Sequence, residues 1–206
     1  MSFQSMLYTS SFRQNLRNLL ERRSIRRGSF KLASGLQSDI YIDGKLTTCS
    51  AEGTRLVGLA FIDLMARNGW KPAAVGGLVI GADPIVISIA RESLESSSPI
   101  DAFLIRKEPK KHGLQKFIEG IEYEPGLPVV IVDDVCTTGG STKDAIDKAR
   151  DAGMKVLGAL CLVDRQMGAE QTMRELDCPF DSVFKLSELL DREEQSAVEP
   201  AEATFA

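Results

Sequence analysis

Two adjacent carboxylates, Asp133 and Asp134, stand between an apolar run, VVIV, and a segment rich in threonine and glycine. The segment contains Thr137, Thr138, Gly139, Gly140, Ser141 and Thr142. Glycine lets backbone amides approach an anion closely, and hydroxyl groups near a helix N-terminus add hydrogen-bond donors. Such a turn can hold one phosphate group. The two acids alternate in direction along a strand end, so one or both can face ribose hydroxyls or a metal-bound water.

The interpretation as a phosphate-binding turn depends on the two acids, because a Gly-Gly or Thr-Thr pair alone is more typical of an ordinary strand-to-helix loop. Two other phosphate-binding motifs are excluded. The P-loop requires GxxxxGK[ST] and the dinucleotide-binding Rossmann turn requires GxGxxG, and neither string occurs here.

The elements around this turn predict an α/β fold. Short apolar segments alternate with amphipathic ones, and strands buried on both faces with crossover helices between them form a parallel, doubly wound sheet. Ligands of such sheets bind beyond the carboxyl ends of the strands, where the turn lies. Helical spacing covers residues 12–20, 51–68, 85–94 and 141–152, a hairpin pattern covers 29–43, and apolar strands cover 73–80, 100–106, 127–134 and 155–164.

Composition limits the class of protein. The 206 residues fit one domain, expected at 1–191, followed by a polar, aperiodic tail at 192–206 that we expect to be disordered. A net charge of −4 argues against a general nucleic-acid binder. No apolar run is long enough to cross a membrane, and the four cysteines lack a CxxC pair, so we expect a cytoplasmic protein with reduced thiols.

The segment VVIVDDVCTTGGST closely resembles the phosphoribosyl pyrophosphate (PRPP) motif of type I phosphoribosyltransferases. The resemblance implies a central, mostly parallel sheet flanked by helices, with a small N-terminal hood at about residues 20–48. It also implies that Asp133 and Asp134 contact the ribose hydroxyls and that residues 137–142 hold the 5′-phosphate, with Val135 and Cys136 in the same PRPP-binding loop. Mg²⁺ is expected as cofactor, held mainly by PRPP and through water by Asp83 or Asp133.

A second segment, RKEPKKHG at residues 106–113, is densely basic, with Glu108 as its one acid. Such a run is usually a solvated charged loop. A reaction that expels pyrophosphate, however, must neutralise several negative charges, for which arginine offers forked hydrogen bonds, lysine compact charge and histidine a titratable donor. We therefore interpret the segment as a functional loop that closes over a reacting centre.

This basic segment is also similar to the catalytic loop of orotate phosphoribosyltransferases. The resemblance implies that Arg106, Lys107, Lys110 and His112 contact the pyrophosphate, and that Lys107, Lys110 and His112 are catalytic together with the two acids. It further implies a homodimer in which the 106–120 loop of one subunit closes over its neighbour's site. The expected reaction transfers the phosphoribosyl group of PRPP to orotate, giving orotidine 5′-monophosphate and pyrophosphate in pyrimidine biosynthesis.

Three further segments extend this resemblance. The hood segment implies that Tyr41 and Ile42 lie beside the base, GGLVIGADPIV matches the pyrophosphate loop, and LVDRQ implies that Arg165 binds the orotate carboxylate with Thr137 as partner. An arginine fork suits that group, which distinguishes orotate from uracil. The alternatives are that Arg165 forms a surface ion pair with Asp164 and that Tyr41 only packs the hairpin.

The sequence departs from the family pattern at two points. It reads KLASG where many members have TLKSG, so that Ala33 replaces a lysine and Lys31 or Lys45 is left to fill the role; and it reads GADPI where some members carry a Tyr-Lys pair. Two rivals stay open. One is a phosphoribosyltransferase for another base, such as a purine. The other is a PRPP-sensing transcription regulator, which would need a DNA-binding module. The acidic net charge and the short stretch of about 20 residues before the hood argue against this second function.

Overall fold

The computed structural model describes residues 3–31, 37–109 and 117–190. A six-stranded sheet in the order β5-β4-β3-β6-β7-β8 forms its centre, and each neighbouring pair is parallel except β4 with β5. The prediction of a mostly parallel sheet is confirmed. The strands are β3 (Ala74–Leu78), β4 (Asp101–Ile105), β5 (Ile118–Glu119), β6 (Pro128–Cys136), β7 (Lys155–Asp164) and β8 (Phe180–Lys185).

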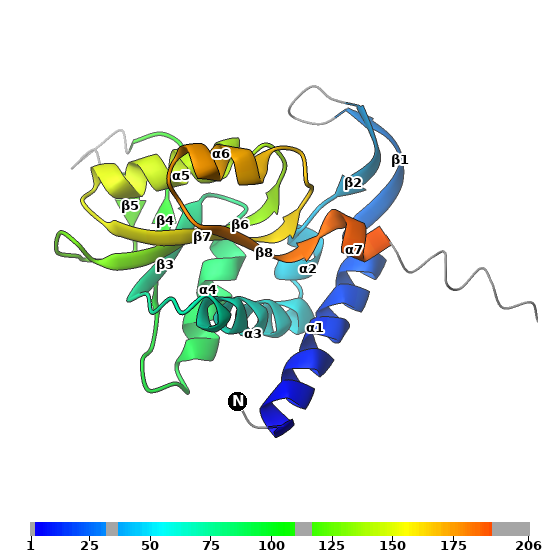
Figure 1. Ribbon diagram of the computed structural model, residues 1–206, viewed down its shortest axis with the longest axis horizontal. Coiled ribbons are helices and arrows are strands. Elements are labelled where there is room, and N and C mark those ends of the chain that lie inside the picture. The colour runs from blue at the N-terminus through cyan, green and yellow to red at the C-terminus, as the bar shows by residue number, and fades with distance from the viewer. Residues whose placement is uncertain (1–2, 32–36, 110–116, 191–206) are drawn as a thin grey trace, which may run out of the picture.

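Helices cover both faces of the sheet (Figure 1): α5 and α6 lie on one face, and α3 and α4 on the other. Alternation along the central strand explains this, because Val130 and Val132 pack into the core that contains α3 and α4, whereas Val129 and Ile131 pack against α5. The helices are α1 (Phe3–Arg23), α2 (Lys45–Thr48), α3 (Ala51–Arg67), α4 (Asp83–Ser93), α5 (Gly140–Asp151), α6 (Ala169–Glu175) and α7 (Leu186–Leu190).

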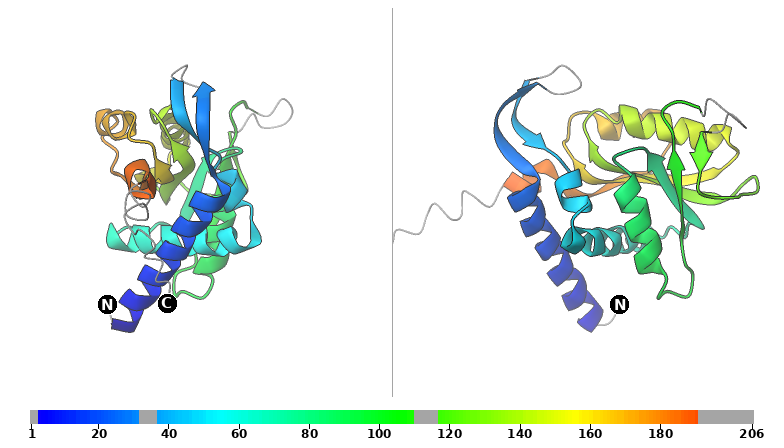
Figure 2. Two further views of the ribbon diagram at one scale, coloured as in Figure 1. Left: turned by 90° about the vertical axis from the view of Figure 1, so that its right-hand side faces the viewer. Right: turned by 180° about the vertical axis from the view of Figure 1, so that it is seen from behind.

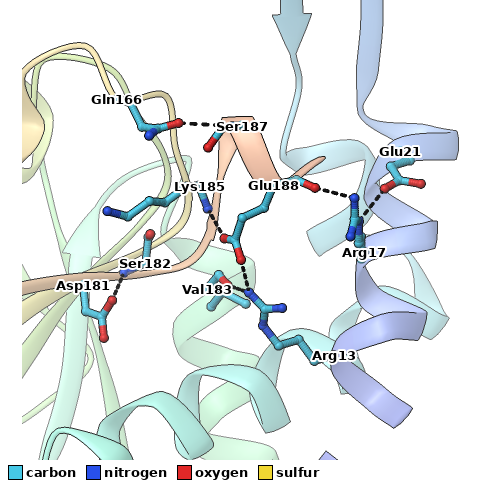
Figure 3. Close-up of polar contacts among 10 residues, drawn as sticks. All are labelled: Arg13, Arg17, Glu21, Gln166, Asp181, Ser182, Val183, Lys185, Ser187 and Glu188. Atoms are coloured by element: carbon cyan, nitrogen blue, oxygen red, sulfur yellow. Dashed lines mark hydrogen bonds and ion pairs between the residues drawn. The ribbon is translucent and has the colours of Figure 1, made fainter. Parts of the chain in front are cut away.

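The predicted hairpin is present as β1 (Ile25–Lys31) and β2 (Gln37–Ile42), which pair antiparallel. It forms the hood, rising from the C-terminal end of α1 at one end of the molecule, as Figure 2 shows from two further sides. Glu188 of α7 anchors the base of the hood (Figure 3). Its Oε1 accepts a hydrogen bond from Nη2 of Arg13 at 3.0 Å, and its backbone oxygen accepts one from Nη2 of Arg17. The first and last described helices are thus joined to each other below the hood.

Two expectations need correction. The strand expected to end at Asp134 runs on through Cys136, because Val135 and Cys136 continue the parallel ladder opposite Val163 and Asp164. Four elements beyond the expected ones are also present, namely β5, β8, α6 and α7, and α2 follows the hood as a single short turn. The tail predicted at 192–206 lies outside the described residues.

Within the described ranges, no helix is long and apolar enough to cross a membrane.

Candidate functional site

The sheet reverses its order between β3 and β6, since β4 lies on one side of this pair and β7 on the other. Such a switch point leaves a crevice beyond the carboxyl ends of the two strands. The loop after β3 and the acids of β6 meet there. A Cβ atom on Gly81 would lie 2.7 Å from Oδ1 of Asp134, so only glycine allows this approach. The fold therefore brings the GADPI loop against both acids.

The turn after β6 adopts the shape that the sequence predicts for a phosphate loop. Gly139 has φ +83° in the left-handed region, and α5 begins at the next residue. Thr172 of α6 donates a hydrogen bond to the Thr138 oxygen at 2.7 Å and braces the loop from outside. Every residue from 133 to 142 lines one cavity of about 440 Å³. The amides at the start of α5 lack helical partners, which makes this cavity a suitable anion site.

The hood closes the same cavity from the other side. Tyr41, Ile42, Lys45 and Arg165 complete its lining. Ile42 is buried, whereas Tyr41 is 42% exposed, and its ring lies 5.4 Å from that of Phe30. Tyr41 thus packs on the hairpin and also faces the cavity, so the two roles weighed for it from the sequence are compatible.

Arg165 is 6% exposed and holds the hood to the central sheet. Its Nη2 donates to Oγ of Ser38 at 3.0 Å and to the Ile40 oxygen at 2.9 Å, while Nε is buried without a hydrogen-bond partner among the described residues. Burial lowers the pKa of this arginine. The alternative of a surface ion pair with Asp164 is wrong for the described structure, because Asp164 is also buried, at 1% exposed, and its carboxylate accepts from the Gln166 amide at 2.8 Å. A buried guanidinium with an unused donor is suited to an anionic ligand.

Asp133 and Asp134 differ in environment. Asp133 is 8% exposed, and its Oδ2 accepts from the Thr142 hydroxyl at 3.0 Å. Burial, followed by the charge of Asp134, raises the pKa of Asp133 to about 7, although the hydrogen bond from Thr142 opposes the rise. Asp134 is half-buried, and its Oδ2 lies 3.7 Å from Nζ of Lys45. Asp133 is therefore the more deeply buried of the two acids, and both of them line the cavity.

Lys45 is the hood-proximal lysine that the structure brings to the acids. Its Nζ lies 3.0 Å from Asp43 and 3.7 Å from Asp134, and it lines both cavities of the site. Partial burial lowers the pKa of Lys45, but the hydrogen bond to Asp43 and the charge of Asp134 outweigh it and raise the pKa overall. The Lys31 side chain and Ala33 lie outside the described residues.

A second cavity of about 690 Å³ adjoins the first and shares Lys45, Asp133, Asp134, Val135 and Ser141 with it. The loop after β3 lines one side and the start of the basic segment lines the other. Its remaining lining residues are Leu78, Val79, Ile80, Gly81, Arg106, Lys107 and Glu108. Lys110 and His112 lie outside the described residues. Asp83, at the start of α4, lines neither cavity, and its Oδ1 is buried without a partner in the described structure.

Three residues contribute to the site in ways that sequence reasoning did not predict, and one of them, Ser38, was missed altogether. Thr142 was expected to help hold a phosphate, yet it is buried and bonds to Asp133 and to Cys136 Sγ, the latter at 3.1 Å. Ser38 supplies a partner for Arg165, and Gly81 allows the contact with Asp134. Alternation in the hairpin is the one signal that hinted at Ser38, because it shares a face with Ile40 and Ile42.

Metal-ligand chemistry at the site is limited to carboxylates. Among the described residues, no group of three or more histidine, cysteine or acidic side chains is arranged to hold a metal ion. Asp133 and Asp134 offer hard oxygen ligands at the cavity. Such a pair suits an ion that takes most of its ligands from a bound phosphate and water.

Comparison with known proteins agrees with this geometry. The family model of the phosphoribosyl transferase domain matches residues 57–188. The orotate phosphoribosyltransferase of Aquifex aeolicus (strain VF5) is 42% identical over 181 residues, which cover 86% of this chain and 97% of that protein. The crystal structure of Mycobacterium tuberculosis H37Rv orotate phosphoribosyltransferase with Fe(III) dicitrate gives a TM-score of 0.76 at 36% identity, covering 87% of this chain and 99% of that one. The same enzyme in complex with PRPP gives a TM-score of 0.72 at 33% identity, covering 86% and 98%.

Proposed function

The chain belongs to the orotate phosphoribosyltransferase family of pentosyltransferases, and from this membership we propose that it transfers the phosphoribosyl group of PRPP to orotate in an Mg²⁺-dependent reaction. The products are orotidine 5′-monophosphate and pyrophosphate, within pyrimidine biosynthesis. Arg165 is the observation that carries the choice of orotate. It is a largely buried guanidinium that lines the same cavity as the phosphate loop, where a carboxylated base has to bind.

In this proposal the two cavities divide the substrates between them. The 5′-phosphate binds to residues 137–142, and the ribose hydroxyls bind to Asp133 and Asp134. The pyrophosphate extends into the larger cavity, between Gly81 and the basic segment that begins at Arg106. Orotate lies between the hood residues Tyr41 and Ile42, with its carboxylate at Arg165 and Thr137. The residues that line the two cavities support this placement, because Asp133 and Asp134 line both of them.

The reaction breaks the bond from C1′ to pyrophosphate and forms a bond from C1′ to N1 of orotate, with inversion at C1′ and loss of the proton that N1 carries. Positive charge develops on the ribose, and Asp134 lies at the cavity to stabilise it. Negative charge develops on the leaving group, which Arg106 and Lys107 neutralise together with Lys110 and His112, the last two assigned by resemblance alone. Positioning and charge stabilisation carry the catalysis, and no covalent nucleophile is needed.

Mg²⁺ fits the carboxylates that are present. Asp133 lines both cavities and Asp83 lines neither, so Asp133 is the better candidate to hold the ion through water. When bound with PRPP, Mg²⁺ neutralises part of the diphosphate charge.

The proposed active unit is a homodimer in which residues 106–120 are shared between subunits. A stripe of apolar side chains supports it, with Ile80 71%, Ile87 57% and Leu94 65% exposed and spaced by seven residues along α4 and the loop before it. Ile87 and Leu94 share one helix face because they are spaced by seven, whereas Ile80 lies in the loop before the helix and lines the larger cavity. A single catalytic domain at residues 1–191 and a cytoplasmic location, which the four free cysteines favour, complete the proposal.

Product detection tests the proposed activity. Purified protein is incubated with Mg²⁺ and PRPP and with orotate, uracil or a purine base in turn, and nucleotide products are separated by chromatography. Orotidine 5′-monophosphate is the expected product, and EDTA should abolish its formation. A purine nucleotide formed without any orotate product would overturn the proposal. Binding to DNA at low salt would instead favour a PRPP-sensing regulator.

A further inference from the structure

Lys148 lies on α5, farther along the helix whose N-terminal end forms the phosphate loop. Its side chain is 13% exposed, which is unusually low for a lysine on an outer helix. Three groups converge on its ammonium: Oδ2 of Asp144 at 2.7 Å, the backbone oxygen of Lys107 at 3.1 Å and the ring centroid of Phe117 at 4.9 Å. Lys148 is therefore satisfied by partners on three different segments.

Two of these partners lie at opposite ends of the connection between β4 and β5. The chain leaves β4 at Ile105 and returns to β5 at Ile118, and the antiparallel pairing extends one step further because the Arg106 amide donates to the Phe117 oxygen at 2.9 Å. Lys107 and Phe117 thus lie at the two ends of this connection, next to the paired residues. Lys148 contacts both ends and ties them to the phosphate-loop helix.

The chemistry of the ammonium suits this arrangement. It carries three donors, one for the Asp144 carboxylate, one for the Lys107 carbonyl and one directed at the ring face. Asp144 lies one turn earlier on the same helix and fixes the direction of the lysine. Another lysine on this helix, Lys143, forms an i,i+4 pair of the opposite order with Asp147, and its side chain is 47% exposed. An exposed pair of that kind contributes little to stability.

Lys107 is the residue through which Lys148 reaches the site. Lys107 and Asp134 both line the larger cavity, and the backbone oxygen of Lys107 accepts a hydrogen bond from Lys148. A fixed carbonyl restricts the peptide plane and so the direction in which the Lys107 side chain leaves the backbone. Correct placement of a charged group against a leaving group has a large effect on rate.

We propose that Lys148 is a positioning residue, which orients Lys107 toward the pyrophosphate by holding its backbone carbonyl and stacking on Phe117. The inference rests on the proposed function, since it needs Lys107 to act on the leaving group. It adds a mechanical link between two parts of the site, because one helix supplies the phosphate loop at its start and the support of Lys107 further along.

The test compares Lys148→Met, which keeps the length and removes the charge, with Lys143→Met as a matched control on the same helix. For Lys148→Met we expect kcat to fall about tenfold with the KM for orotate within about twofold, because a misplaced catalytic group lowers the rate more than it weakens binding of the base. Lys148→Arg should recover most of the rate, because arginine also donates to a carbonyl and stacks on a ring. A Lys148→Met enzyme that matches Lys143→Met in kcat overturns the inference.

A double-mutant cycle separates positioning from general damage. In a Lys107→Ala background, Lys148→Met should cause no further loss of kcat, because two residues that act as a unit are not additive. An equal tenfold loss in both backgrounds would show that Lys148 does not act through Lys107.

A measurement without substrate keeps the inference independent of the activity assay. Hydrogen exchange at the Arg106 amide should accelerate in Lys148→Met and stay unchanged in Lys143→Met. Equal exchange in both variants overturns the proposed contact. If the wild-type chain itself forms no orotidine 5′-monophosphate, the proposed function fails, and this failure is distinct because it precedes any substitution.

Discussion

Asp133 combines burial with a charged neighbour, and this combination makes it costly to keep ionised. The pKa of Asp133 in the folded chain is about 7, above its ordinary value of 3.8. Between these two pH values the unfolded chain has released the proton and the folded chain retains it, so the contribution of this group to stability falls as the pH rises. Residues that serve catalysis often carry such a cost.

Asp133→Asn tests this cost in the Mg²⁺-free protein. The amide mimics the protonated acid and can still bond to Thr142, so we expect the variant to melt at a higher temperature than wild type at pH 8. The difference should shrink toward pH 4, where the wild-type acid is also neutral, and activity should be lost at every pH. Thermal unfolding followed across this range measures the effect. A constant difference in melting temperature would contradict the assigned pKa.

Arg165 holds the hood and also lies at the proposed carboxylate site. We therefore expect its replacement to weaken the binding of orotate more than the binding of PRPP. For Arg165→Gln we expect the KM for orotate to rise roughly 100-fold, since a hydrogen bond to a charged group contributes up to about 3 kcal/mol. The KM for PRPP should change by less than about threefold on the same grounds. Arg150→Gln, an exposed arginine on α5, provides the control in initial-rate kinetics. Equal rises in both KM values would mean that Arg165 acts only through the fold.

At the scale of elements, Glu188 joins three parts of the chain: α7, the end of β8 and the helix that carries the hood. Its Oε2 accepts from the Lys185 amide at 2.7 Å, and its Oε1 accepts from Arg13, which also donates to the Val183 oxygen at 2.9 Å. Partial burial raises the pKa of Glu188, but the Lys185 amide and Arg13 outweigh it, so the pKa is lowered overall. The stabilisation is therefore present above the ordinary pKa of glutamate and is lost as the pH falls through the lowered value.

Glu188→Gln should destabilise the fold by about 1 kcal/mol or less at pH 7, a modest figure because the side chain is 44% exposed and screened by solvent. Near pH 4 the difference from wild type should narrow. Urea unfolding at both pH values measures it, with Glu170→Gln as control, since Glu170 pairs with Lys185 away from α1. The interpretation would be wrong if Glu170→Gln lowered the free energy of unfolding as much as Glu188→Gln does.

The sequence predicts an element well when the hydrophobic pattern of its own residues is enough to define it. Strand β7 matches its predicted range of 155–164 because ten largely apolar residues leave no other choice. Strand β8, FDSVFK, places polar residues at an edge of the sheet, and β5 has two residues whose pairing with β4 defines it. Such segments become strands through their neighbours, and a single sequence does not contain that information. The last residues of β6 were missed for the same reason.

At the scale of the whole molecule, the site depends on contacts between distant segments. Resemblance predicted which residues belong to it, but the bond from Arg165 to Ile40 spans 125 positions. The pairing of Lys45 with Asp134 likewise joins the segment after the hood to the central strand. Helical or strand periodicity fixes the face of a residue within its own element and says nothing of a partner so far away. The order of strands in the sheet determines which of these distant residues come into contact.

The same scale governs assembly, where the apolar stripe on α4 gives the last prediction. Ile87→Glu places a charge in the middle of the proposed interface, and burying an unpaired charge there is costly. We expect light scattering to give a mass near the 22.5 kDa of one chain, whereas wild type gives twice that mass. Because the loop at residues 106–120 is proposed to be shared between the subunits, kcat should fall with dissociation and recover as protein concentration rises. Gln171→Glu, exposed on α6 across the sheet, should change neither. A fully active monomer would separate catalysis from assembly.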